Sequence, residues 1–270
     1  MINKTIGLWD GVNNESTESG AYNPTLVTYV LAGQKQRGAV LICPGGGYRY
    51  TSDREAEQIA LQFNAAGFHA FVVYYTTDPV KHPKPLMEVS RAVCIIREHA
   101  EEWMVKADEI AVCGFSAGGH LAASLGVHWD KPYLLQTMGI TKDLNKPNAL
   151  ILSYPVISSG EFAHRDSFVS LLGEDADSSL LHEMSLEHQV NEKTPPTFIW
   201  HTFEDKSVPV ENSLMFAQSL RKNSIPFEMH IYPHGKHGMS LATEETDHVN
   251  PHVASWMGLC IEWLRTCAFK

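Results

Sequence analysis

Short, almost uninterrupted apolar runs alternate along the chain with longer segments in which apolar residues recur every three or four positions. The short runs are rich in β-branched and aromatic residues, which predicts strands buried on both faces of a mainly parallel sheet. The predicted strands are Thr25–Leu31, Gly38–Cys43, Phe68–Tyr75, Ile110–Cys113, Ala149–Tyr154, Thr197–Thr202 and Phe227–Tyr232. We expect the first of them to lie at an edge of the sheet.

The segments between the strands have the length and period of amphipathic helices. From Leu86 to Trp103 the apolar residues fall on one helical face. Ser52 and Glu55 have the spacing of a capping box, which predicts a helix from there to about Gly67. Two further predicted helices are Val210–Lys222 and Pro251–Phe269. The alternation indicates an α/β fold, with a central sheet flanked by helices on both faces.

The segment from Ser158 to Pro196 departs from this rhythm, because it is long, polar and patterned like short helices. An insertion between strands at such a place often lies over a site. No repeat, low-complexity tract or long linker divides the chain. We therefore predict a single domain, 1–270, with a small cap insertion at about 158–196.

Residues Gly114 to Gly118 read G-x-S-x-G and stand between a predicted strand and a helix of small residues. In that setting the motif forms a strained turn that exposes the serine hydroxyl at the carboxyl edge of the sheet. The start of the helix also favours negative charge that develops nearby. A Gly-Ser turn that only caps the helix is the alternative, but the flanking strand and helix favour Ser116 as a nucleophile. His120, inside the helix, is expected to fix local packing by hydrogen bonding.

A serine nucleophile needs a base, and the base needs an orienting carboxylate. In folds that carry this motif the chain order is serine, acid, histidine. The chain has 14 histidines, so position rather than composition must select the base. His237 lies in a Gly-flanked loop beyond the strand Phe227–Tyr232, at the edge where Ser116 emerges, and is the predicted base. His234 follows the strand so closely that we expect it to point elsewhere, and it is the alternative.

The acid is expected after the preceding strand, Thr197–Thr202, and two carboxylates follow it. Asp205 begins an Asx-type turn before Val208 and Pro209, which suits a side chain that reaches across to the histidine. Asp205 is therefore the predicted acid and Glu204 the alternative. Either carboxylate could instead be a solvated charge in a turn.

Three successive glycines follow the strand Gly38–Cys43, in the sequence PGGGY. Such a loop exposes N–H groups that a ligand can approach closely, and esterases use a similar HGGG loop for part of the oxyanion hole. We predict oxyanion donors at Gly46 and Gly47, with the N–H of Ala117 completing the set. A phosphate-binding turn is the alternative, but the loop lacks the G-K-[ST] ending of a P-loop and lacks G-x-G-x-x-G.

The spacing of the histidines gives no metal-binding pattern. His230, His234 and His237 are loosely spaced, and the pair His248 and His252 has a proline between its members. Neither arrangement matches H-E-x-x-H or a Cys/His zinc site. We expect no metal and no other cofactor.

Composition and charge narrow the class of partner. The chain has 270 residues, of which 44 % are hydrophobic and 19 % charged, as in globular proteins. A net charge of −10 without a basic run argues against nucleic acid or an anionic membrane as partner. No run is long enough to span a membrane, and the N-terminus has no apolar region of a secretory signal. Five cysteines without a C-x-x-C pair indicate reduced thiols in a cytoplasmic protein.

With these motifs the chain resembles the α/β-hydrolase superfamily over essentially its whole length, and more narrowly the bacterial group that includes acetyl-xylan esterase-like carbohydrate esterases. The stretches that carry this resemblance are VLICPGGGYRYTSDREAEQIA, VCGFSAGGHLAA, TPPTFIWHTFEDKSVPVENS and YPHGKHGMSLA. The resemblance supports Ser116, Asp205 and His237 as a catalytic triad.

The resemblance implies a serine esterase that hydrolyses short acyl esters, acetyl above all, on xylo-oligosaccharides or related sugars, without a cofactor. Another short-chain carboxylesterase or an arylformamidase is the first alternative, and a non-catalytic hydrolase-fold binding protein is the second. The expected partner is therefore a small-molecule ester. The sequence leaves the oligomeric state open, a homo-oligomer included.

Overall fold

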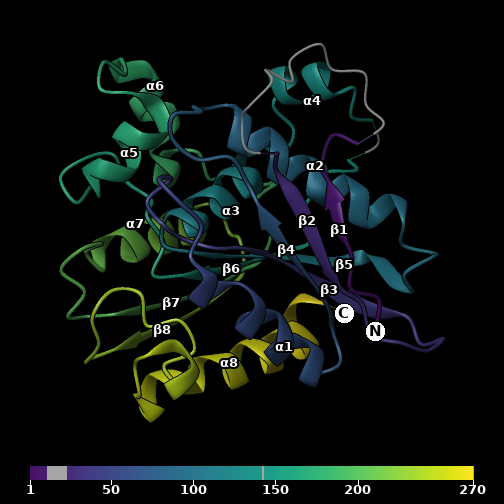
Figure 1. The fold of residues 1–270 in the computed structure, drawn as a ribbon. Helices are drawn as coiled ribbons and strands as arrows, with labels where there is room; N and C mark the ends of the chain where they lie inside the picture. Colours follow the sequence, from purple (N-terminus) through teal and green to yellow (C-terminus); the bar gives the residue numbers. More distant parts are fainter. Residues whose placement is uncertain (11–22, 142, 270) are drawn as a thin grey trace.

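A single mixed sheet organises the part of the chain that the computed structural model describes, residues 1–10, 23–141 and 143–269 (Figure 1). Its strands are β1 Thr5–Gly7, β2 Thr25–Tyr29, β3 Arg37–Cys43, β4 His69–Tyr74, β5 Val105–Phe115, β6 Ala149–Ser153, β7 Thr197–Thr202 and β8 Phe227–Tyr232. Their order across the sheet is β1-β2-β4-β3-β5-β6-β7-β8. The six strands β4, β3, β5, β6, β7 and β8, neighbours in this order, pair in parallel. β2 pairs antiparallel with both β1 and β4.

Helices cover both faces of the sheet, as the sequence predicts. The α-helices are α1 Glu57–Ala65, α2 Lys84–Glu98, α3 Ala117–His128, α4 Pro132–Met138, α5 Arg165–Leu172, α6 Ser178–Glu183, α7 Glu211–Lys222 and α8 Pro251–Trp263. α2, α3 and α7 pack on one face, and α1 and α8 pack on the other (Figure 1). A π-helical turn, Leu264–Ala268, follows α8. None of the described helices has the length and apolar character needed to cross a membrane.

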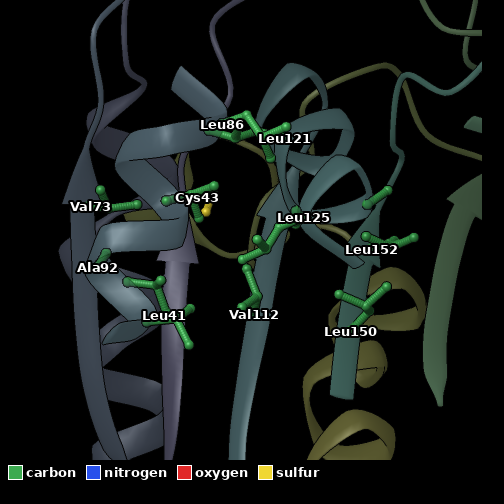
Figure 2. Close-up of a cluster of buried hydrophobic side chains, with 14 of the residues drawn as sticks. Leu41, Cys43, Val73, Leu86, Ala92, Val112, Leu121, Leu125, Leu150 and Leu152 are labelled. Atoms are coloured by element: carbon green, nitrogen blue, oxygen red, sulfur yellow. The ribbon is translucent and has the colours of Figure 1, made fainter. Parts of the chain in front are cut away.

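Alternation along the strands builds a separate core on each face. In β3, Leu41 and Cys43 point to the α2 and α3 side, where Figure 2 shows them among leucines of both helices, while Val40 and Ile42 point to the α1 and α8 side. All four are fully buried. Burial of one such aliphatic side chain contributes about 2 kcal/mol. The uninterrupted apolar runs of the sequence therefore reflect strands enclosed on both sides.

The N-terminal edge of the sheet differs from the prediction. We expected the strand Thr25–Leu31 at an edge, but β2 has partners on both sides, because the three-residue β1 pairs with it from Thr5 to Gly7. So short a strand has no periodicity that the sequence could display. Residues 11–20 of the N-terminal stretch in which no secretory signal is predicted lie outside the described residues.

The predicted capping box at Ser52 is wrong. The Ser52 side chain makes no capping hydrogen bond, and Asp53–Glu55 forms a short 3-10 helix before α1 begins at Glu57. Glu55 is instead buried and accepts hydrogen bonds from the Gly45 N–H and the Tyr154 hydroxyl. Local spacing assigns the Glu55 carboxylate to a helix cap, but in the structure it accepts hydrogen bonds from Gly45 and Tyr154 in the protein interior.

The 158–196 segment contains α5, α6 and the 3-10 helix Leu186–His188. Two histidines of α3 hold it. His120 Nε2 donates to the Met184 carbonyl at 2.9 Å, and His128 Nε2 lies 3.3 Å from the Glu183 carbonyl oxygen. His120 Nδ1 also accepts from the Tyr48 hydroxyl at 2.9 Å, which fits the packing role predicted for this residue. The boundaries of a cap insertion stay a prediction.

Acid should weaken this attachment. Burial lowers the pKa of His120 from 6.5 to about 4, and burial likewise lowers that of His128 to about 4. Each histidine is therefore neutral in the folded protein at pH 7, so its contribution to stability is full above pH 6.5 and is lost progressively as the pH falls from 6.5 to about 4. For His120 the loss amounts to about 3 kcal/mol at pH 4.

We expect the melting temperature to fall from pH 7 to pH 4, and to fall less steeply in His120→Gln. The measurement is thermal unfolding followed by circular dichroism across this range. The variant can be less stable than the wild type at pH 7, but the difference between them should shrink towards pH 4. Parallel curves for the two proteins would contradict the burial of a neutral imidazole.

Candidate active site

The turn at Ser116 joins β5 to α3 and places the serine at the carboxyl edge of the sheet. Its backbone is left-handed, with φ 53° and ψ −119°. A Cβ added at Gly114 would lie 2.1 Å from the Gly118 carbonyl oxygen, and one added at Gly118 would lie 2.1 Å from that of Cys43. Both glycines are therefore required by backbone packing, as the sequence predicts for G-x-S-x-G.

The structure brings Ser116, His237 and Asp205 together in a hydrogen-bonded row. Ser116 Oγ lies 2.8 Å from His237 Nε2, and His237 Nδ1 lies 2.6 Å from Asp205 Oδ2. Because the carboxylate accepts the Nδ1 proton, Nε2 is left as an acceptor for the serine hydroxyl. The row thus has the order of nucleophile, base and orienting acid.

Asp205 is held in the Asx-type turn predicted from the sequence. Its Oδ1 accepts the N–H groups of Ser207 and Val208, both at 2.9 Å. Burial would raise the pKa of Asp205, but hydrogen bonds from His201, His237 and Val208 and the charge of His237 hold it well below the usual range. The carboxylate is therefore ionised at neutral pH and can stabilise an imidazolium.

His201 is a neighbour of the acid that the sequence analysis missed. It lies at the end of β7, fully buried, with Nε2 3.4 Å from Asp205 Oδ2 and 3.0 Å from the Val208 carbonyl oxygen. Its Nδ1 accepts from the Ser213 hydroxyl at 2.7 Å. The only signal in the sequence is that His201 stands four residues before Asp205. That spacing does not show whether the imidazole ring points towards the carboxylate.

The two alternatives for the triad lie elsewhere. His234 Nδ1 and Glu204 Oε1 pair with each other at 3.0 Å, and both side chains are more than half exposed. Within the described part of the chain, neither side chain forms a hydrogen bond with Ser116 or His237. Glu204, one residue before Asp205, and His234, three residues before His237, thus both face solvent.

The glycine loop after β3 lies beside the serine. Gly46 and Gly47 have φ 129° and 65°, and a Cβ on Gly46 would lie 2.0 Å from the Tyr50 carbonyl oxygen. Both line a hollow of about 300 Å³ together with Ser116 and His237. Ala117 is the first residue of α3, directly after the serine. The three predicted oxyanion donors therefore belong to segments that meet at Ser116.

The rim of this hollow is mostly polar. Arg49 and His164 line it from two different segments, and Arg49 lies 3.6 Å from Asp166 of α5. Tyr50 also lines it and is 62 % exposed. Arg49 and Tyr50 belong to a stretch that carries the family resemblance, but the sequence analysis assigned a role to none of these three positions.

Metal-binding geometry is absent from the described residues, 1–10, 23–141 and 143–269, in which no group of three or more His, Cys, Asp or Glu side chains is placed to hold an ion. Of the histidines considered above, His230 instead pairs with Glu228 at 2.8 Å. All five cysteines are free thiols, and four of them are buried.

Comparison with known proteins places the chain among esterases. The BD-FAE family model matches residues 28–220. The chain is 39 % identical over 247 residues to endo-1,4-beta-xylanase B of Butyrivibrio fibrisolvens, covering 88 % of this chain and 38 % of the relative. It is 31 % identical over 211 residues to an acetylxylan esterase of Xylanibacter ruminicola, covering 76 % of this chain and 42 % of the relative. The chain thus spans about two fifths of the length of these curated relatives.

Solved structures match along nearly the whole chain. An acetyl ester-xyloside bifunctional hydrolase from Caldicellulosiruptor lactoaceticus is 40 % identical, with a TM-score of 0.89 over 98 % of this chain and 97 % of that one. The carboxylesterase Cest-2923 from Lactobacillus plantarum is 25 % identical, with a TM-score of 0.80 over 98 % and 97 %. These matches confirm the predicted α/β-hydrolase fold. The matched proteins include an acetylxylan esterase and a carboxylesterase, in line with the predicted enzyme class. The chain belongs to the BD-FAE family of α/β-hydrolases.

Proposed function

We propose that this protein is a serine esterase that removes short acyl groups, acetyl above all, from acetylated xylo-oligosaccharides or related sugars. The observation that carries the proposal is the hydrogen-bonded row from Ser116 through His237 to Asp205, set beside a glycine loop. Relatives named for acetylated xylan and acetyl esters support the substrate class.

The geometry supports hydrolysis through an acyl-enzyme. His237 Nε2 takes the proton of Ser116 as Oγ attacks the ester carbonyl carbon, and Asp205 stabilises the imidazolium. The N–H groups of Gly46, Gly47 and Ala117 hold the oxyanion, and each such donor contributes about 3 kcal/mol. The alcohol leaves with the proton from His237. Water then gives its proton to His237 and attacks the acyl-serine. As the acid is released, His237 returns that proton to Ser116 Oγ, so the enzyme is restored and no cofactor is needed.

The size and polarity of the site favour a small acyl group on a polar alcohol. The hollow beside Ser116 holds about 300 Å³, and arginine, histidine, serine and glutamate side chains line it. Hydroxyl groups of a sugar need hydrogen-bond partners once they leave water, which such a rim supplies. The small space among Phe168, Leu171 and Val156 is filled by side chains and has no room for a ligand. A long acyl chain therefore finds no apolar channel there.

A broader short-chain carboxylesterase is the second candidate, favoured by the fold match to the carboxylesterase of Lactobacillus plantarum. The same triad would then act on simple alkyl or aryl esters. A panel of acetylated xylo-oligosaccharide and p-nitrophenyl acetate separates the two. The first candidate requires a higher kcat/KM for the acetylated sugar, and the second requires the reverse.

Replacement of the nucleophile tests the mechanism. We expect Ser116→Ala to lower kcat for p-nitrophenyl acetate at least a thousandfold, because loss of a triad member commonly costs more than that. The left-handed backbone at this position strains alanine no more than serine, so the melting temperature should hold. A fluorophosphonate should label the wild type and leave the variant unlabelled. Retention of more than about one hundredth of the activity would exclude Ser116 as nucleophile.

Acyl length tests the proposed substrate class. We expect kcat/KM to fall at least tenfold from acetyl or butyryl to octanoyl p-nitrophenyl esters. The reason is that the closed space beside Phe168 and Leu171 cannot provide the roughly 0.8 kcal/mol gained for each buried methylene. Equal or rising values out to decanoyl esters would indicate an apolar acyl tunnel and a lipase.

A further inference from the structure

Glu55 is a buried carboxylate that the proposed triad mechanism does not use. Its side chain lines the same hollow as Ser116 and His237, yet the residue is only 5 % exposed. Burial raises its pKa, while hydrogen bonds from Tyr154 and Gly45 and the charges of His237 and Arg54 oppose that rise. A buried carboxylate destabilises a protein unless it is fully hydrogen-bonded. The hydrogen-bond partners of Glu55 therefore show which segments its carboxylate connects.

One oxygen of Glu55 holds the glycine loop. Oε2 accepts the Gly45 N–H at 2.8 Å. A Cβ added at Gly45 would lie 2.7 Å from that same oxygen and 2.7 Å from the Phe115 carbonyl oxygen. The loop is therefore clamped between the carboxylate and the residue just before Ser116. Gly45 itself cannot donate to a substrate, but it fixes where the N–H groups of the next two glycines begin.

The other oxygen of Glu55 reaches the segment that follows the catalytic histidine. Oε1 lies 2.5 Å from the Tyr154 hydroxyl oxygen, and that hydroxyl accepts the Ser240 N–H at 3.0 Å. Tyr154 must therefore donate its proton to Glu55. The Tyr154 ring also contacts the His237 ring edge to face, with centroids 5.1 Å apart. Ser240 stands three residues after His237, so one carboxylate joins both sides of the hollow.

Backbone strain accompanies this connection. Tyr154 has φ 38° and Ser240 has φ 51°, the left-handed region that non-glycine residues seldom adopt. Such a backbone conformation is strained and persists only where its surroundings fix it. The Ser240 side chain adds a further tie, because its Oγ donates to the Arg54 carbonyl at 2.6 Å. The hydrogen bonds from Tyr154 to Glu55 and from Ser240 to Tyr154 are thus among the contacts that hold two strained residues in place.

We propose that Glu55 is a positioning residue of this esterase: its carboxylate aligns the Gly45–Gly47 loop, which carries the oxyanion donors, with the segment that carries His237. The inference rests on the proposed function. It gives a kinetic signature, because oxyanion donors act on the transition state and contribute little to the binding of the ester. Loss of alignment should therefore lower kcat and leave KM nearly unchanged.

Three variants test the proposal with p-nitrophenyl acetate, with kcat expressed per active site titrated by a fluorophosphonate. We expect Glu55→Ala to lower kcat at least a hundredfold with KM within threefold of the wild type. Glu55→Gln should recover kcat to within about tenfold, since its amide oxygen can accept from Gly45 and its NH₂ can donate to the Tyr154 oxygen. Glu88→Gln is the matched control and should keep kcat within threefold.

Glu88 of α2 suits this purpose because it is a second buried carboxylate, and it accepts hydrogen bonds from the N–H and hydroxyl groups of Thr76. The proposal is overturned if Glu55→Ala keeps kcat within threefold, if its loss appears in KM alone, or if Glu88→Gln loses as much. A general loss of stability would not produce the recovery expected of Glu55→Gln.

Unfolding separates this inference from the proposed function. The melting temperatures of Glu55→Ala, Tyr154→Phe and the double variant should be non-additive, since both single changes break the same connection. Additive shifts would overturn the connection whatever the enzyme hydrolyses. Absence of any ester turnover by the wild type, with non-additive shifts, would instead overturn the proposed function and leave Glu55 as a structural link.

Discussion

The close approach of two stretches of backbone determines the layout of the site. A Cβ at Gly118 would lie 2.1 Å from the Cys43 carbonyl oxygen and 2.4 Å from that of Pro44. The start of α3 therefore lies directly against the end of β3, with no side chain between them. This contact brings Ser116 beside the glycine loop. The position of the hollow between them is therefore set by the backbone. Any larger residue at Gly118 would force the two apart.

Buried charge in this protein is matched by hydrogen-bond donors. Asp205 accepts two backbone N–H groups and a histidine N–H, and Glu55 accepts one backbone N–H and one hydroxyl. Each carboxylate is enclosed, yet each has donors for both of its oxygens. His120 and His128 of α3 avoid a buried charge altogether, because burial lowers the pKa of each and they stay neutral at pH 7.

The sequence was sufficient for those features that recur within a few residues. Apolar runs revealed the parallel strands, and the loops after them had to meet at one edge, which is why Ser116, Asp205 and His237 could be named. Glu55 was misassigned because its partners are Gly45 and Tyr154, 10 and 99 residues away. Local spacing favours a helix cap, and only the tertiary fold brings the interior donors to the carboxylate. The ring of His201 could not be placed for the same reason.

The attachment of the 158–196 segment to α3 has an evolutionary consequence. His120 and His128 contact the segment through the main-chain carbonyls of Met184 and Glu183. Every amino acid supplies that carbonyl, so these two hydrogen bonds do not depend on which side chains stand at positions 183 and 184. Exposed side chains of the segment can therefore change without loss of these two hydrogen bonds. A graft of this stretch between family members must preserve its backbone path and its buried core side chains, which are Phe168, Leu171, Met184, Leu186 and Val190.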